Sequence, residues 1–376
     1  MSQLSPMSPK KEKILKIAAV VFTICVMTSI SLYFNVFRHK IGKDSIVKNI
    51  SNYEPVRFSV LLYGDEKINP GDLNVFFITY ERRNNVFKVL SVNTDMVVIR
   101  KKNKALSFRK SFNETSKKDL QLAITNLYTD IFELTENNLM LDFYISATYS
   151  AFLEFCDGDE KIKELVLKKD FKTRDEKLMN QIEITETFLN LVKNNYGSFK
   201  TRANKKLKLI DSNISKTAYV RMLKFNKKYN PFVIFFDLPA KYTKKRVVPD
   251  KKNILNLLPV YYLGLNEEIR TKKAVVDVKN ASGRPRMAEK AAWVLRANGF
   301  DVMEWGTSPL RYNRTLIKDY KGYYDESLRA AQVLGCGKIV ITYNAQSFHD
   351  ISVFIGKDCV IYDKLDNVEE AGNGKN

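Results

Sequence analysis

The sequence predicts a mixed α/β protein: an α+β sandwich around a central sheet, then a small C-terminal α/β domain, both after one N-terminal transmembrane helix. Three patterns carry this prediction. An uncharged apolar run lies near the N-terminus, alternating apolar segments typical of strands begin near residue 58, and helical and strand patterns alternate over the rest of the chain. With 376 residues, 45% of them hydrophobic, the chain can form two ordinary cores.

The N-terminal run from Ile17 to Phe34 has no charged residue and is long enough to cross the hydrocarbon core of a bilayer. Basic residues stop it at positions 38 to 40. Because bulky side chains continue past the small-residue pattern at positions 29 to 31, the run is typical of an uncleaved signal-anchor and not of a cleaved signal peptide. We therefore expect a single-pass membrane protein with residues 41 to 376 outside the cytoplasm. A buried helix of a soluble core is the alternative.

The net charge of +20 is concentrated in one region, since residues 193 to 252 hold 17 Lys and Arg against three Asp. Such a surface attracts polyanions such as nucleic acid, anionic lipid headgroups, lipid-linked pyrophosphates or an acidic wall polymer. Between Phe199 and Tyr229 the lysines interleave with apolar residues, so one helical face can pack while the other faces anionic lipid or wall polymer. A lysine-rich face that only keeps the protein soluble is the alternative.

The four cysteines have no metal-binding spacing, so no metal site is assigned. Cys336 and Cys359 could form a disulfide in an oxidising compartment, but two buried thiols in neighbouring strands are the favoured interpretation. Only two histidines are present, which argues against histidine-based catalysis, and His349 is expected in a surface turn.

Strand and helix patterns define the larger domain. The expected elements are strands at Phe58 to Tyr63, Val75 to Tyr80, Val86 to Val92 and Val97 to Ile99, a helix from Ser116 to Phe132, a strand from Phe143 to Ser146, and a helix through Tyr149 and Cys156.

The C-terminal domain begins with a strand from Val275 to Val278. The turn at residues 280 to 283 leads into a helix with Pro285 in its first turn and Gly299 as its stop. The remaining expected elements are a strand from Phe300, a helix that ends at Gly335, and strands at Lys338 to Thr342 and Ile351 to Ile355.

These patterns divide the chain into seven segments. They are a cytoplasmic tail (1–16), a transmembrane signal-anchor (17–37), a stalk (38–56), the larger domain (57–260), a linker (261–273), the C-terminal domain (274–361) and a polar tail (362–376).

Residues 275 to 358 resemble the C-terminal domain of LytR-CpsA-Psr cell-envelope proteins. The resemblance rests on the run from Val276 to Gly283, the helix that ends at Gly299, and the strand from Asp350 to Asp358. It implies a protein of the bacterial cytoplasmic membrane with an accessory or binding role for this domain.

A more diffuse similarity covers nearly the whole larger domain. Residues 60 to 65 look like the opening strand and turn of the family's catalytic domain, Asp72 stands in the position of its Arg-Ser-Asp-Thr motif, and Asp95 in that of its Ser-Ile-Pro-Arg-Asp motif. Family members transfer a glycopolymer from a polyprenyl-pyrophosphate carrier to peptidoglycan. The resemblance therefore implies the cytoplasmic membrane as a partner, together with an anionic envelope glycopolymer, a polyprenyl-pyrophosphate lipid or peptidoglycan.

The arginines of those motifs are missing. Catalysis in the family relies on arginines that clamp the pyrophosphate and carboxylates that hold a divalent cation. Here Pro70 and Gly71 replace the Arg-Ser pair, Thr94 replaces the second motif arginine, and the helix from Lys177 to Leu191 has no arginine where the family is rich in them. Removing one preorganised charge-stabilising donor typically costs ~3 kcal/mol of transition-state stabilisation, so we expect a domain that kept the fold and lost the reaction.

Asp72 and Asp95 remain as predicted catalytic residues, and the alternative is that they only end a turn and a strand. Four basic residues could restore the anion site from other loops, and two more lie near a helix N-terminus of the C-terminal domain, where a solvated turn is the alternative. These anion-binding candidates are Arg100, Arg109, Lys110, Arg174, Arg284 and Arg286.

Three functions are compatible with these residues. The favoured one is a membrane-anchored scaffold that binds envelope polymer or its lipid-linked precursor with a degenerate catalytic site. The first alternative is an active glycopolymer phosphotransferase, which would need Mg²⁺. The second is a DNA-binding regulator, but it requires the basic domain to be cytoplasmic and the sequence has no helix-turn-helix or RNA-binding motif, so nucleic acid is not expected as a partner.

Overall fold

The computed structural model of the chain describes residues 55–81, 86–99, 105–169, 171, 173–229, 232–243, 246–263 and 273–361. The predicted cytoplasmic tail, transmembrane helix, polar tail and nearly all of the stalk lie outside these residues, as does Arg100. In the described part of the chain, no helix combines the length and the apolar character needed to span a bilayer.

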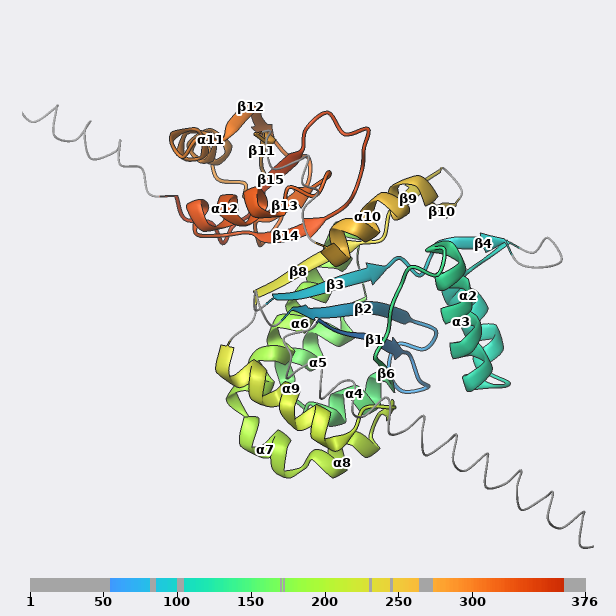
Figure 1. Cartoon of the computed structure of the whole chain (residues 1–376). Coiled ribbons are helices and arrows are strands. Elements are labelled where there is room, and N and C mark those ends of the chain that lie inside the picture. Colours follow the sequence, from blue (N-terminus) through green and yellow to red (C-terminus); the bar gives the residue numbers. More distant parts are fainter. Residues whose placement is uncertain are drawn as a thin grey trace, which may run out of the picture.

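One sheet of eleven strands runs through both halves of the described chain, in the order β12-β11-β15-β13-β14-β8-β3-β2-β1-β6-β7 (Figure 1). Its first half consists of β1 (Val56–Tyr63), β2 (Leu73–Glu81), β3 (Val86–Val92), β6 (Phe143–Thr148), β7 (Asp211–Ser212) and β8 (Phe232–Asp237). β1, β2 and β3 form an antiparallel meander, and β6 and β8 add to its two sides in parallel. The strand predictions for β1, β2, β3 and β6 are therefore confirmed.

Side chains at alternate positions of the central strands point to opposite faces of the sheet, and they are buried on both faces. In β2, Leu73 and Val75 point to one face, and Phe76 and Ile78 point to the other. The first face is covered by α2 (Phe108–Ser116), α3 (Leu120–Leu134) and α10 (Lys251–Leu263), and the second by α4 (Tyr149–Phe155), α5 (Glu160–Leu167), α6 (Arg174–Asn194) and α9 (Lys216–Tyr229). This is the α+β sandwich that the sequence predicts.

Smaller elements complete this half. They are the short helices α7 (Tyr196–Thr201) and α8 (Ala203–Lys208), and two hairpin pairs, β4 (Val97–Ile99) with β5 (Ala105–Ser107) and β9 (Ala240–Tyr242) with β10 (Val247–Pro249).

One helix starts later than the sequence predicts, because its N-cap residue lies further along the chain. The prediction of a single helix from Ser116 is wrong, because Ser116 is the last residue of α2 and α3 starts at Leu120. Asp119 accepts a hydrogen bond from the backbone N–H of Leu122 and so caps α3, which satisfies one of the free donors of the first turn.

The C-terminal half contains β11 (Val275–Asn280), α11 (Met287–Ala297), β12 (Asp301–Thr307), β13 (Leu316–Asp319), α12 (Tyr324–Leu334), β14 (Lys338–Ile341) and β15 (Ile351–Ile355). Gly299 and Gly335 follow the two helices with φ of 83° and 65°, so both predicted stops are confirmed. The placement of Pro285 inside α11 is wrong, because Arg286 takes a left-handed φ of 54° and the helix starts only at Met287.

The two predicted domains share a sheet. β14 pairs in parallel with β8, with Val340 opposite Phe235, and so joins the halves. The predicted linker start at residue 261 is also wrong, because α10 continues to Leu263. Tyr261 explains this extension, since its side chain is fully buried and its hydroxyl donates a 2.9 Å hydrogen bond to the Phe77 carbonyl.

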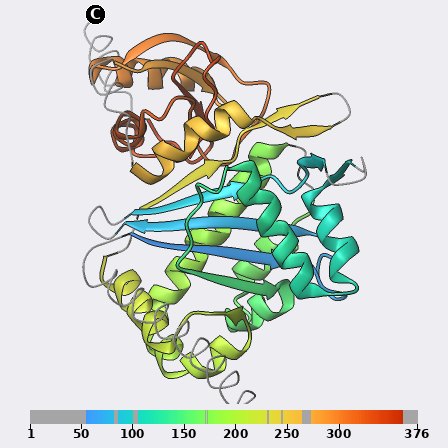
Figure 2. The same cartoon turned by 45° about the vertical axis from the view of Figure 1, so that its right-hand side comes forward.

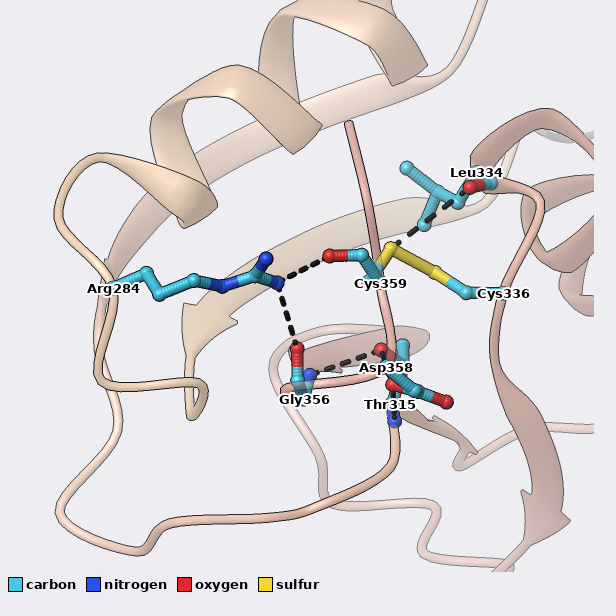
Figure 3. The surroundings of a disulfide bond; sticks show 7 residues. All are labelled: Arg284, Thr315, Leu334, Cys336, Gly356, Asp358 and Cys359. Carbon is cyan, nitrogen blue, oxygen red and sulfur yellow. Dashed lines mark hydrogen bonds between the residues drawn. A yellow bond between two sulfur atoms is a disulfide. The ribbon is translucent and has the colours of Figure 1, made fainter. Parts of the chain in front are cut away.

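Cys336 and Cys359 form a disulfide with a Cα–Cα distance of 5.4 Å, so the prediction of two free thiols in neighbouring strands is wrong (Figure 3). Neither residue lies in a strand: Cys336 follows α12 and Cys359 follows β15. The bond fastens the end of the last strand to the end of the last helix. Their separation of 23 residues gives no local signal of this contact.

Candidate functional site

A polar cluster lies at the edge of the sheet where β3, β6 and β8 end and β2 begins. It contains four residues that the sequence singled out, Asp72, Asp95, Arg109 and Arg174, together with Lys177 of α6. Lys177 interacts electrostatically with all four of the others, so the structure brings both predicted carboxylates and two of the predicted cations into one site.

Asp72 lies immediately before β2 and is held from two sides. The Tyr149 hydroxyl donates a 2.9 Å hydrogen bond to one carboxylate oxygen, and Lys177 Nζ lies 3.9 Å from the other. Burial, followed by the Asp72 charge, raises the pKa of Tyr149 well above its ordinary value, so this hydroxyl remains a donor. Burial lowers the pKa of Lys177, and Asp72 opposes that shift.

Arg174, the first residue of α6, forms an ion pair and hydrogen bonds with buried neighbours. Its guanidinium pairs with Asp237 at 2.5 Å and donates a 3.0 Å hydrogen bond to Ser91 Oγ. Burial disfavours the charge, but the Asp237 carboxylate outweighs that effect and raises the pKa of Arg174. The Arg174 charge is therefore already neutralised by a buried partner.

Asp95 and Arg109 form the outer part of the site. Their side chains pair at 2.6 Å, with 42% and 43% of the side-chain surface exposed. The Arg109 backbone N–H donates to the carbonyl of Thr94, and the Thr94 hydroxyl donates to the carbonyl of Leu73. Thr94 thus makes a buried structural contact between β2 and the turn after β3.

A chain of side-chain hydrogen bonds connects the two buried ends of the site. Gln181 accepts a 2.8 Å bond from Ser91 Oγ and donates a 2.8 Å bond to Asn74 Oδ1, and Asn74 also contacts the Tyr149 hydroxyl. The chain runs from Arg174 to Asp72 through β2, β3 and α6, which fixes the spacing of these charges.

An apolar cavity of about 220 Å³ opens beside Asp72. Among its lining residues, Asp72, Lys168 and Lys177 are charged and partly or fully exposed, so they mark its mouth, and Asn74 and Gln181 also line the cavity. Its walls come from the second face of the sheet and from α4, α6 and α9, and the aromatic members are Phe58, Phe76, Phe87, Tyr149, Phe152, Phe155, Phe171, Phe188 and Tyr219. A long apolar group with a polar head would fit this shape.

The other predicted anion-binding residues lie elsewhere. Lys110 is exposed on α2, and Arg100 lies outside the described residues. Arg284 donates to the backbone carbonyls of Cys359 and Gly356, which ties the turn before α11 to the disulfide segment (Figure 3). Arg286 pairs with Glu289 at 2.9 Å.

Lys177 is the site residue that sequence reasoning missed. The sequence predicts this helix from Lys177 and without an arginine, but α6 starts three residues earlier, at Arg174. The available signal was the position of Lys177 one turn after Arg174, since residues three apart lie on the same side of a helix.

The acidic residues of α6 also have an unexpected role, because they face the C-terminal half. Asp175 accepts from Lys318 Nζ at 2.7 Å and from the Tyr312 hydroxyl at 2.8 Å. Glu183 and Glu186 form further ion pairs, and their partners are Arg314 at 2.9 Å and Lys338 at 2.6 Å. These acidic side chains of α6 therefore bind the neighbouring domain.

One further group of metal-ligating side chains lies in the C-terminal half, formed by Asp277, Glu304 and His349. The Lys279 ammonium lies 3.0 Å from Asp277 and 2.8 Å from Glu304, and His349 is 3.8 Å from Glu304. His349 lies in the bend before β15 as expected, but only 16% of its side chain is exposed. The lysine neutralises these carboxylates, so we assign no metal to them.

Residues 273–358 match the family described as LytR cell envelope-related transcriptional attenuator. No curated protein matches the chain in sequence. Similar solved structures include a transcriptional regulator from Enterococcus faecalis (11% identity, TM-score 0.44, 58% of this chain and 91% of that one). Two others are TagV from B. subtilis (11%, 0.42, 57% and 99%) and TagT bound to LIIa-WTA (14%, 0.37, 55% and 91%). The C-terminal domain of this chain, residues 273–358, thus belongs to the LytR C-terminal family, as its sequence predicts.

Proposed function

We propose that the protein is a membrane-anchored cell-envelope protein that binds a polyprenyl-pyrophosphate-linked glycopolymer precursor. The observation that supports this most directly is the apolar cavity with a charged mouth. An isoprenoid tail would lie between the sheet and α6, and the pyrophosphate would lie beside Lys177 and Lys168. Each tail methylene moved out of water contributes about 0.8 kcal/mol, so the tail would supply most of the affinity.

The charges of the polar cluster favour binding over turnover. Three carboxylates face three cations in pairs: Asp72 with Lys177, Asp95 with Arg109, and Asp237 with Arg174. A departing pyrophosphate needs positive charge that is free to stabilise it, and breaking such a pair leaves a carboxylate unmatched. We therefore propose that the site holds the precursor without transferring its saccharide.

The same ion pairs occupy the carboxylates that would have to bind the divalent cation of a transferase reaction. Mg²⁺ prefers carboxylate oxygens, but Asp72 and Asp95 already pair with Lys177 and Arg109. As arranged, these residues do not fit a resident Mg²⁺. No step of the proposed function depends on one.

The disulfide supports a location outside the cytoplasm. Structural disulfides persist in oxidising compartments and are rare in the cytosol, and Cys359 is completely buried beside Arg284. Together with the apolar run from Ile17 to Phe34, this favours a single-pass protein of the bacterial cytoplasmic membrane with both domains on the outer side.

An active phosphotransferase is the second candidate. It is favoured by the convergence of Arg109, Arg174 and Lys177 on one site, since these cations partly replace the missing motif arginines. In this case the precursor's pyrophosphate would have to displace Asp72 or Asp95 from its cation.

Binding and turnover of a polyprenyl-pyrophosphate-linked saccharide by the full chain in detergent micelles, with and without Mg²⁺, separate these candidates. Binding without release of polyprenyl pyrophosphate supports the scaffold. Release of polyprenyl pyrophosphate, lost in Asp72→Ala, establishes the transferase instead. Absence of binding in both conditions rules out both.

A matched pair of variants tests the proposed mouth of the cavity. Lys177→Ala removes a cation beside Asp72, and Lys117→Ala removes an exposed lysine of the turn between α2 and α3. Loss of a hydrogen bond to a charged group costs about 1.5–3 kcal/mol, so we expect Lys177→Ala to weaken binding by about 10-fold or more. Lys117→Ala should bind like the unchanged protein.

A further inference from the structure

We propose that the basic outer surface of α7, α8 and α9 docks on anionic phospholipid headgroups, so that this end of the protein faces the bilayer. Figures 1 and 2 show these three helices together at one end of the molecule and α11 and α12 at the opposite end. The C-terminal domain would then point away from the membrane. This inference concerns orientation and does not depend on what the cavity binds.

The charge of this surface is strongly one-sided. Residues 193 to 229 contain eleven Lys and Arg and a single acidic residue, Asp211. The exposed lysines of the three helices, hereafter the basic surface, are Lys200, Lys205, Lys208, Lys216, Lys224 and Lys227. Asp157, which lies beside α8, pairs with Arg202 and Lys206 and not with any of these six lysines in the described ion pairs, so the surface keeps a positive potential.

The fold holds this surface in place. On α9, Ala218 and Leu223 are buried in the core, whereas Lys216, Lys224 and Lys227 are exposed. Lys206 of α8 is different, because it points inward and pairs with Asp157 at 2.7 Å. The outward lysines are thus presented by a packed framework, and docking would not require a new fold.

The chain enters the fold at this same end. Val56 and Phe58, at the start of β1, pack in one cluster with Phe199 of α7 and Leu223 of α9. The predicted span ends at residue 37 and β1 starts at Val56, so only the 18 residues 38 to 55 separate them. Such a segment spans at most about 60 Å when fully extended, so the tether keeps the basic surface within reach of the bilayer.

The side-chain chemistry favours lipid headgroups over a polymer. The exposed cations of the three helices are mainly lysines, which act as mobile point charges, and the exposed Arg202 between α7 and α8 already pairs with Asp157 at 3.6 Å. Recognition of a specific phosphate or base usually relies on the planar fork of arginine and on exposed aromatic faces. Each lysine near an anionic leaflet contributes about 1 kcal/mol, and no defined groove is needed. Tethering makes even this diffuse attraction effective.

The test measures lysine acetylation, by mass spectrometry, on the full chain inserted into lipid nanodiscs. One set contains only phosphatidylcholine, and the other also contains phosphatidylglycerol. We expect the lysines of the basic surface to react at least about 5-fold more slowly in the anionic discs, because ~1 kcal/mol per lysine corresponds to about that factor. Neither set contains polyprenyl lipid, so the result is independent of the proposed ligand.

Two triple variants give the matched comparison. In Lys205→Glu/Lys208→Glu/Lys216→Glu, protection of the remaining lysines Lys200, Lys224 and Lys227 should disappear. In Lys251→Glu/Lys252→Glu/Lys357→Glu, which changes exposed lysines on α10 and after β15, protection should persist.

Three outcomes overturn the proposal. The first is equal acetylation in neutral and anionic discs, and the second is protection that survives the first triple variant. The third is protection by added poly(glycerol phosphate) with none from phosphatidylglycerol, which would assign the basic surface to a wall polymer.

Discussion

The Asp175 carboxylate accepts a 2.7 Å hydrogen bond from Lys318 Nζ, and this bond links α6 of the first domain to β13 of the LytR-type domain. Asp175 directly follows Arg174 and lies two residues before Lys177. The helix α6 therefore holds two cations of the polar cluster, Arg174 and Lys177, and also contacts the C-terminal domain.

Asp175→Asn should loosen this junction. Both partners are largely buried, with 18% and 16% of the side chains of Asp175 and Lys318 exposed, so loss of the charged hydrogen bonds should lower the free energy of unfolding by about 1.5–3 kcal/mol. Both tryptophans, Trp293 and Trp305, belong to the C-terminal domain. Urea denaturation of the full chain in detergent, followed by tryptophan fluorescence, measures the change.

Two comparisons make this measurement specific. Asp325→Asn removes an exposed carboxylate on α12 and should change stability by less than about 0.5 kcal/mol. Lys318→Met combined with Asp175→Asn should be less harmful than the sum of the single changes, because the two residues share one interaction. Strict additivity would mean that the bond contributes nothing to the junction.

Ile184→Trp should block the apolar cavity. Ile184 lines the cavity from α6, and an indole there would occupy space that a lipid tail needs. We expect the affinity for a polyprenyl-pyrophosphate lipid to fall by about 10-fold or more, since excluding even two methylenes removes about 1.6 kcal/mol. Leu122→Trp, at an α3 position that is 49% exposed, is the control and should leave binding unchanged. Undiminished affinity of a folded Ile184→Trp protein would place the tail elsewhere.

Replacing the disulfide by Cys336→Ser/Cys359→Ser should destabilise the C-terminal domain. The bond joins residues 23 positions apart in the sequence. A disulfide that closes a loop of this size typically raises the free energy of unfolding by about 3 kcal/mol. The melting temperature of the unchanged protein should fall in dithiothreitol to that of the variant, and the variant should not respond to the reductant. A reductant effect of equal size on both proteins would contradict a structural role for the bond.

Local patterns in the sequence predicted the elements well. The strands from Val86 to Val92 and from Ile351 to Ile355 have the predicted bounds, and the glycines at 299 and 335 end their helices. These features depend on the alternation of side chains and on the backbone freedom of single residues, which neighbouring positions reveal. The C-terminal family assignment rests on the same contiguous stretch.

Long-range contacts were the part that the sequence did not reveal. The pairing of β14 with β8 and the disulfide join residues whose neighbours in sequence carry no sign of each other. In the site, Asp72 and Asp95 were found through motif positions, but Lys177 reaches them only because α6 crosses the edge of the sheet. The contacts of the acidic residues of α6 with the C-terminal domain are likewise long-range and have no local signal in the sequence.

Asp319 gives the C-terminal domain a pH-dependent stability. Its side chain is completely buried at the end of β13, and burial raises its pKa from 3.8 to about 6, although backbone N–H donors of Lys321 and Gly322 oppose the shift. The folded state therefore holds this proton more tightly than the unfolded state. The resulting stabilisation is complete below about pH 4 and is lost as the pH rises through about 6.

Asp319→Asn should remove this dependence while keeping an oxygen that accepts the same backbone bonds. The rise of the Asp319 pKa from 3.8 to about 6 on folding corresponds to about 3 kcal/mol of folding free energy. The unfolding free energy of the unchanged protein, minus that of Asp319→Asn, should therefore fall by up to about 3 kcal/mol between pH 4 and 7. Urea titrations at closely spaced pH values give this difference, and Asp325→Asn, which changes an exposed carboxylate, should run parallel to the unchanged protein. A difference that rises with pH would mean that the folded state prefers the Asp319 carboxylate charged, because its backbone donors would then outweigh burial.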